Sequence, residues 1–92
     1  MRRIIDATPH FERALASFVK THKDLRPKVF SLIDRLSKNP FNPKNKTHSL
    51  LGDLKGMYAA SVDRKYRLIF LMGSDAITLI NIGSHDEVYK NK

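Results

Sequence analysis

The 92-residue sequence contains no cysteine and no tryptophan. Without cysteine, disulfides, thiolate zinc sites, iron–sulfur clusters and cysteine nucleophiles are excluded, and the composition fits a reducing cytosol. No apolar run approaches the roughly 20 residues of a membrane helix, and polar residues interrupt any signal-peptide core near the N-terminus. We therefore expect one domain spanning residues 1–92, located in the cytoplasm and without a membrane partner.

Common catalytic motifs are also missing. The sequence has no Walker loop, no G-x-G-x-x-G, no H-E-x-x-H and no G-x-S-x-G pattern. Its carboxylates do not cluster at a spacing that would hold magnesium. A metal site built from His48 and His85 would be poor in further ligands. We therefore expect no cofactor and no metal, so that a nuclease of this sequence would be metal-independent.

Negative charge is scarce: 17 lysines and arginines stand against 9 acidic residues, a formal net charge of +8. Such a field attracts polyanions, so nucleic acid is the first expected partner and an acidic protein the second. The excess is concentrated in the middle of the chain. The basic residues there are Lys38, Lys44, Lys46, Lys55, Arg64, Lys65 and Arg67, opposed only by Asp53 and Asp63.

Two amphipathic helices are expected in the first half. Thr8 is a good N-cap, and Pro9 suits the first helical position because its missing N–H has no partner there. Apolar residues then recur at the spacing of one helical face, up to about residues 21–23. Asp24 is expected to cap a second helix. Asn39-Pro40 should end it, because the residue before proline is pushed out of the helical region.

Strands account for most of the remaining chain. They are expected at residues 2–7, 57–62, 66–72 and 76–82, with short turns that make the last three an antiparallel meander. Ser84 and Glu87 form an S-x-x-E capping box, which predicts a short terminal turn of helix. The order β-α-α-β-β-β predicts a two-layer α+β domain with the helical hairpin on one face of the sheet. The other face should be open and carry the basic residues.

Two histidines are candidates for proton transfer. His85 lies between the last strand and the terminal turn, and His48 lies in the polar loop before the meander. Imidazole titrates near neutrality, so one ring could take the proton of an RNA 2′-hydroxyl while the other protonates the leaving 5′ oxygen. Both could equally be ordinary surface residues. His10 and His22, which flank the first helix, are interpreted as solvated.

Arg67 is the candidate for holding a phosphate. An arginine within a strand needs an anionic partner, and its planar guanidinium matches phosphate oxygens. The alternative is a salt bridge to Asp63 or Asp86. Strand alternation puts Arg67 and Ile69 on one face of the sheet, opposite Tyr66.

Several further residues are candidates for binding substrate. As a group, the basic side chains would supply non-specific phosphate contacts: Lys46, Lys55, Arg64 and Lys65. Tyr66 and Tyr89 offer rings on which bases could stack. Tyr66 could equally belong to the core, whereas Tyr89 in a polar tail is harder to explain that way.

With these residues in view, the chain resembles the RelE/ParE superfamily of bacterial type II toxins, and most closely its YafQ-like mRNA interferases. The resemblance is carried by T-H-S-L-L-G-D-L-K-G-M-Y, by the strand K-Y-R-L-I-F and by the terminal I-G-S-H-D-E-V-Y. It covers nearly the whole chain, because the leading strand and the helical hairpin also fit.

The resemblance implies a toxin that cleaves translated mRNA on the ribosome, in the decoding site, by attack of the 2′-hydroxyl and without a metal. It also implies an acidic antitoxin as partner. His48 and His85 match histidines of the YafQ-like toxins, and Arg67 matches the strand arginine that stabilises the pentavalent phosphate in the RelE branch. Tyr89 and Tyr66 fall where those toxins place an aromatic and a tryptophan.

The sequence departs from the family in ways that leave other functions open. The paired lysines of the RelE branch would fall near Ala59 and Ser61, and Lys65 stands where YafQ-like toxins have an aspartate. Lys65 and Lys55 could replace part of that charge. One alternative is a non-enzymatic inhibitor of DNA gyrase of the ParE kind. Another is an inactive homologue that only binds an antitoxin.

Overall fold

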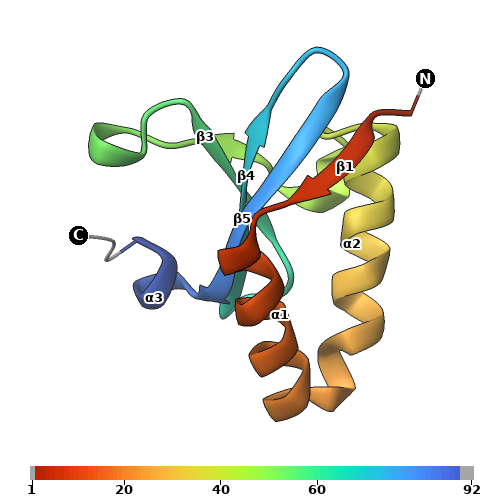
Figure 1. Cartoon of the computed structure of the whole chain (residues 1–92), viewed down its shortest axis with the longest axis vertical. Coiled ribbons are helices and arrows are strands. Elements are labelled where there is room, and N and C mark those ends of the chain that lie inside the picture. The colour runs from red at the N-terminus through yellow and green to blue at the C-terminus, as the bar shows by residue number, and fades with distance from the viewer. Residues whose placement is uncertain (1, 90–92) are drawn as a thin grey trace.

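The computed structural model of the chain describes residues 2–89, which form a mixed sheet with helices on both of its faces (Figure 1). The helices are α1 (Pro9–Thr21), α2 (Arg26–Lys38) and α3 (His85–Tyr89). The strands are β1 (Ile4–Ala7), β2 (His48–Ser49), β3 (Met57–Ser61), β4 (Tyr66–Met72) and β5 (Ala76–Ser84). Three short 3-10 turns connect them: η1 (Lys23–Leu25), η2 (Pro43–Asn45) and η3 (Gly52–Leu54).

The helical hairpin forms largely as its local signals predict. The Thr8 hydroxyl oxygen accepts a hydrogen bond from the Phe11 amide at 3.0 Å, which confirms the predicted N-cap of α1. Helix α2 ends at Lys38, and Asn39 takes the extended conformation that the following proline imposes. The prediction that Asp24 caps α2 is wrong. Asp24 lies inside η1, and this single tight turn makes the connection between the two helices.

The sheet has the strand order β1-β5-β4-β3-β2. The predicted antiparallel meander of β3, β4 and β5 is confirmed. Strand β1 pairs in parallel with β5, where Ile4 faces Ala76. The two-residue strand β2, which the sequence predicted only as loop, pairs with Tyr58 and Ala59 of β3. The fold is therefore the expected α+β arrangement with one additional edge strand.

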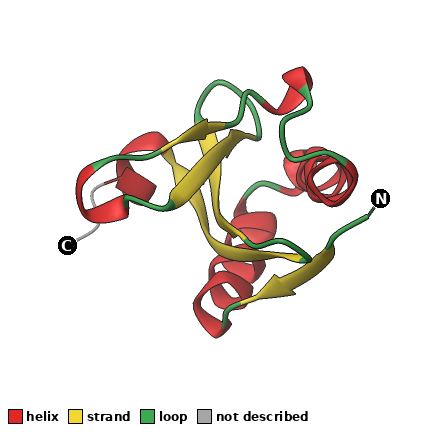
Figure 2. Cartoon of the chain, turned by 90° about the horizontal axis from the view of Figure 1, so that it is seen from above, coloured by secondary structure: helices red, strands yellow, loops and turns green. Residues whose placement is uncertain are grey.

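The main core lies between the sheet and the helical hairpin, where Phe11, Leu32 and Phe70 are almost completely buried. The opposite face is not open, as the sequence had predicted. There, Leu50 and Val88 pack over Ile69, so that the chain around η3 and helix α3 covers this face. Figure 2 shows α1 and α2 on one side of the sheet and α3 on the other. The face on which the basic residues were expected therefore carries an apolar cluster.

The predicted capping box at the end of β5 is confirmed. The Ser84 amide donates to Glu87 Oε1 at 2.8 Å, and the Glu87 amide donates to Ser84 Oγ at 3.2 Å. Helix α3 therefore starts immediately where β5 ends.

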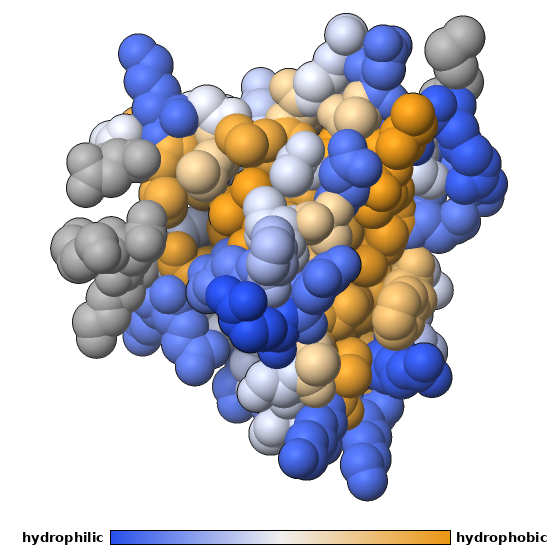
Figure 3. All heavy atoms as spheres, viewed as in Figure 1, coloured by the Kyte–Doolittle hydropathy of each residue, from blue (hydrophilic) through white to orange (hydrophobic). Residues whose placement is uncertain are grey.

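Apolar side chains also reach the surface, and Figure 3 shows an orange apolar band between β1 and α2. None of the helices described is both long enough and apolar enough to cross a membrane.

Candidate active site

Arg67 is the second residue of β4, the central strand of the sheet, where it pairs with Ser61 of β3 and Gly83 of β5. Its Nη1 donates hydrogen bonds to the backbone carbonyls of Asp63 at 2.7 Å, Arg64 at 3.1 Å and Tyr66 at 3.1 Å. One guanidinium nitrogen thus holds the β3–β4 turn. Within residues 2–89, Arg67 makes no salt bridge with a carboxylate, so the alternative of a bridge to Asp63 or Asp86 is wrong.

A hollow opens beside Arg67 at the edge of β3. Strand β2 pairs only with Tyr58 and Ala59, so the edge of β3 at Ser61 is left without a neighbouring strand. The hollow has a volume of about 630 Å³. Its lining side chains are mostly cationic: Arg35, Lys44, Lys46, His48, Ser61, Val62, Asp63, Arg64 and Arg67. Five formally positive groups around one carboxylate make this hollow suited to a polyanion.

Four of the predicted site residues meet in this hollow, and sequence reasoning missed two others. Those predicted are His48, Arg67, Lys46 and Arg64. The ones missed are Arg35 of α2 and Lys44 of η2. Arg35 is held by Asn45, whose Oδ1 accepts from Arg35 Nε at 2.8 Å and whose side chain is completely buried. No local signal could reveal this contact, because it joins a helix to an irregular loop ten residues further on.

His48 lies on β2 and is exposed to solvent. Its Nδ1 is 3.4 Å from the carbonyl oxygen of Lys46. Because a carbonyl only accepts hydrogen bonds, this contact favours the tautomer of the neutral ring with its proton on Nδ1, in which Nε2 is an acceptor. Lys46 itself has φ of 52°, a left-handed conformation that costs a residue with a Cβ about 1 kcal/mol.

His85 lies at the start of α3, beside the β3–β4 turn. Its amide donates to the Lys65 carbonyl at 3.0 Å, so the backbone of Lys65 is next to it. The ring of His85 meets that of Tyr89 edge-on, with centroids 4.3 Å apart. Its Nδ1 is 3.6 Å from a carboxylate oxygen of Asp86. The two histidines do not line one hollow, because the turn stabilised by Arg67 lies between them.

Tyr89 connects Arg67 with His85. Its hydroxyl oxygen is buried and has no hydrogen-bond partner among the described residues. Burial raises the pKa of the Tyr89 hydroxyl, and the positive charge of Arg67 lowers it by a smaller amount. Arg67 pairs with Gly83, two residues before His85, so Arg67, His85 and Tyr89 form a series at one end of the sheet.

The remaining candidates lie apart from this series. Tyr66 is on the helical side of the sheet, where its ring is 5.0 Å from that of Phe18 and 4.7 Å from that of His22. His22 is therefore partly buried in an aromatic cluster, and its interpretation as solvated is wrong. Lys55 is exposed in the turn just before β3, near the end of that strand far from Arg67. The Lys65 side chain is exposed in the turn.

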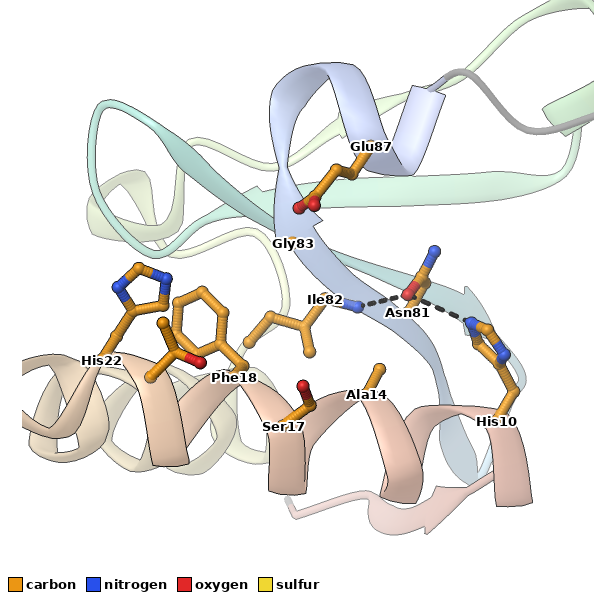
Figure 4. A pocket seen from close by; sticks show the side chains of 10 residues that line it. His10, Ala14, Ser17, Phe18, His22, Asn81, Ile82, Gly83 and Glu87 are labelled. Atoms are coloured by element: carbon orange, nitrogen blue, oxygen red, sulfur yellow. Dashed lines mark hydrogen bonds between the residues drawn. The ribbon is translucent and has the colours of Figure 1, made fainter.

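A separate hollow, of about 420 Å³, lies between α1 and the β5–α3 junction (Figure 4). His10 and His22 reach it from α1, and Glu87 from α3. His10 Nε2 is 3.3 Å from Asn81 Oδ1, which also accepts a hydrogen bond from the Ile82 amide. Across residues 2–89, no three His, Asp or Glu side chains gather closely enough to hold a metal ion.

Comparison with known proteins places this chain among bacterial toxins. Residues 3–90 match the family model described as "Bacterial toxin of type II toxin-antitoxin system, YafQ". The chain is 29% identical over 80 residues to "Toxin RelK" of Mycobacterium tuberculosis, covering 87% of this chain and 89% of that protein.

The fold is also similar to solved structures. YafQ from E. coli strain BL21(DE3) superposes with a TM-score of 0.83 at 24% identity, covering 96% of this chain and 99% of that one. YafQ in the E. coli DinJ–YafQ toxin–antitoxin complex gives a TM-score of 0.81 at 24% identity, over 97% and 99% of the two chains.

Proposed function

Because this chain belongs to the YafQ family of bacterial type II toxins, we propose that it is an endoribonuclease that cleaves translated mRNA on the ribosome. The 2′-hydroxyl of the cut nucleotide attacks the adjacent phosphorus. The bond to the 5′ oxygen of the next nucleotide breaks, which leaves a 2′,3′-cyclic phosphate and a free 5′-hydroxyl. The reaction requires one group to remove a proton, one to donate a proton and a positive charge at the phosphate.

The observation that carries this proposal is the position of Arg67. Arg67 lines the hollow that contains His48, and it pairs with Gly83, two residues before the His85–Tyr89 pair of α3. Nη1 is occupied by carbonyls of the turn, which fixes the plane of the guanidinium and leaves Nη2 and Nε to donate to phosphate oxygens. Positive charge for the pentavalent phosphate therefore comes from Arg67 and the basic lining of the hollow.

The proposed roles of the two histidines start from the ring contact of His48. His48, with its proton on Nδ1 toward the Lys46 carbonyl, has Nε2 available as the base that removes the 2′ proton. His85, whose Nδ1 is 3.6 Å from a carboxylate oxygen of Asp86, is then the group left to protonate the 5′ oxygen. We assign His48 as general base and His85 as general acid.

Tyr89 and the other basic residues complete the proposed site. The Tyr89 ring, edge-on to His85, orients the acid and offers an apolar surface to a base. Lys46 and Arg64 contact neighbouring phosphates from the hollow. Lys55, Lys65 and Tyr66 lie outside the hollow, and we propose only peripheral contacts with the ribosome for the two lysines.

We also propose an antitoxin as the regulatory partner. The similar E. coli toxin was solved in complex with DinJ. With a net charge of +8, this chain would be complemented by an acidic protein that covers the basic hollow. The cytoplasm is the compartment in which such a toxin would meet both antitoxin and ribosomes.

Primer extension on a defined mRNA in a reconstituted translation system tests the proposed function. Wild-type protein should produce cuts at in-frame positions only when ribosomes are present, and His85→Ala should remove them. Arg13→Gln on the exposed surface of α1 is the control and should cut normally. Intact mRNA, together with inhibition of DNA gyrase, would instead support the ParE-like alternative. Intact mRNA, together with normal growth of cells that express the protein, would indicate an inactive homologue.

A further inference from the structure

Three hollows on the surface of α2 follow one another without interruption. The basic hollow beside Arg67 shares Arg35 and Val62 with a second hollow of about 350 Å³. The second hollow shares Pro27 with a third, of about 480 Å³, at the tip of the helical hairpin. From Arg35 to Arg26, this path follows α2 for about 14 Å. A chain leaving the candidate active site would therefore find a continuous groove.

The side chains along this path are cationic. Beyond Arg35, the second and third hollows are lined by Lys28, Arg26 and Lys23, and no carboxylate lines either of them. Between these charges lie the short side chains of Pro27 and Ser31, which leave room for a bound chain. The single acidic residue of α2, Asp34, is held by Arg2 and Lys38 and lines none of the three hollows.

An exposed aromatic ring lies at the far end. Phe30 is 45% exposed, and the Arg26 guanidinium lies 5.2 Å from the centre of its ring. An exposed phenylalanine beside stacked arginine is typical of surfaces on which nucleic-acid bases stack. The exposed large apolar residues elsewhere in the described chain, Ile4, Phe41, Leu51 and Leu71, line none of these hollows.

We propose that Lys23, Arg26, Lys28 and Phe30, here called the α2 track, bind the backbone and one base of single-stranded RNA that extends from the active-site hollow. This inference rests on the proposed function, because it names the path of the substrate beyond the cut. An acidic polypeptide helix fits the track less well, since docking such a helix would require an apolar stripe and the track offers one ring. RNA needs only spaced cations and a stacking surface.

The test uses 2′-O-methyl RNA, which has no nucleophilic hydroxyl and so remains intact. Two fluorescein-labelled oligonucleotides are titrated by anisotropy, one of about 3 nucleotides and one of about 10. Arg26→Gln/Lys28→Gln is compared with Arg13→Gln/Lys20→Gln, which removes the same charge from exposed positions of α1. Phe30→Ala is compared with Phe41→Ala, another exposed phenylalanine that lines none of the three hollows.

Wild-type protein should bind the longer RNA more tightly, and the track double variant should lose most of that gain. Its salt slope, the change of log K with log salt, should fall by about 1.4, corresponding to two lost phosphate contacts on a single strand. The α1 double variant should keep the wild-type slope. Phe30→Ala should weaken binding of the longer RNA by roughly fivefold or more, and Phe41→Ala should not.

Three results would overturn the proposal. The first is equal affinity of wild-type protein for both RNAs, and the second is equal weakening by the track and α1 double variants. The third is binding of poly-L-glutamate with the same dependence on Arg26 and Lys28 and none on Phe30, which would indicate a surface for acidic protein. Ribosome-dependent cleavage by wild-type protein alongside any of these results would leave the proposed nuclease function intact and remove only the track.

Discussion

The ring of His85 meets the ring of Tyr89 edge-on, with centroids 4.3 Å apart and an interplanar angle of 84°. The two residues are four positions apart on α3, so the helix itself brings them together. The Tyr89 hydroxyl is buried, and Arg67 pairs across the sheet with Gly83, two residues before His85. A five-residue helix thereby joins a candidate proton donor to the arginine that we propose holds the phosphate.

Replacing Arg67 by glutamine should raise the pKa of Tyr89. Burial already raises this pKa above its ordinary value, and the Arg67 charge is the influence that opposes burial. Ultraviolet absorbance of the tyrosinate follows the titration, with Arg67→Gln/Tyr89→Phe identifying the contribution of Tyr89. Arg64→Gln removes an equal charge nearby and should leave the Tyr89 titration almost unchanged. An unchanged Tyr89 titration in Arg67→Gln would contradict the proximity of the two groups.

The same burial predicts how stability depends on pH. The folded pKa of Tyr89 is raised above its unfolded value near 10.0, so unfolded chains lose the proton first as the pH rises. The contribution of Tyr89 to the free energy of unfolding is thus constant below about pH 10 and decreases above it. In urea denaturation between about pH 8 and pH 11, the free energy of unfolding should decrease more steeply with pH for wild type than for Tyr89→Phe. Parallel curves would refute this.

Gly83→Ala should disrupt the capping box of α3. An added Cβ would lie 2.8 Å from Glu87 Oε1, the atom that accepts the hydrogen bond of the Ser84 amide. Glu87 can move away, but it then loses this bond, so we expect a loss of about 1 kcal/mol in the free energy of unfolding.

Glu87→Ala removes the same bond, and the two substitutions should therefore be strongly non-additive in a double-mutant cycle. Glu87→Gln keeps an acceptor oxygen and serves as the matched control, with stability near that of wild type. Additive losses, measured by urea denaturation, would show that Gly83 acts independently of the cap.

Substitutions of Lys46 can separate the effect of its charge on RNA binding from the effect of its strained backbone on stability. Its φ of 52° favours glycine or asparagine, so Lys46→Asn and Lys46→Gly should match or exceed the wild-type free energy of unfolding. Both variants remove a charge from the hollow and should weaken RNA binding, whereas Lys46→Arg should keep binding and the strain. Thermal denaturation and anisotropy measure the two effects. A clear loss of stability in Lys46→Gly would mean that the lysine side chain supports this loop.

Much of the fold was predictable because its signals are local. Thr8, the Asn39-Pro40 pair and the Ser84–Glu87 box each act over at most four residues, and the structure confirms all three. Alternation along β4 correctly separated Arg67 from Tyr66, because neighbouring residues of a strand face opposite sides. The cap assigned to Asp24 failed, since the tight connection between the helices draws that residue into a 3-10 turn.

The shape of the site depends on contacts that no short pattern records. Strand β2 exists only through its pairing with β3, and that pairing positions His48 at the hollow. Arg35 joins the hollow through the buried Asn45, a contact between helix and loop. The second face of the sheet was expected to be open, but Leu50 and Val88, far apart in the sequence, cover it together. Sequence patterns could therefore name candidate residues, whereas their positions depend on contacts between distant parts of the chain.

The central claim is that Arg67 holds the scissile phosphate. The most direct measurement is the single-turnover rate of mRNA cleavage on programmed ribosomes by Arg67→Gln. Asp63→Ala is the control for the turn, because it removes the acceptor of the Lys65 and Tyr66 amides and keeps every positive charge. We predict a rate roughly 100- to 1,000-fold below wild type for Arg67→Gln and a far smaller loss for Asp63→Ala. A folded Arg67→Gln protein that cleaves within threefold of wild type would contradict the account.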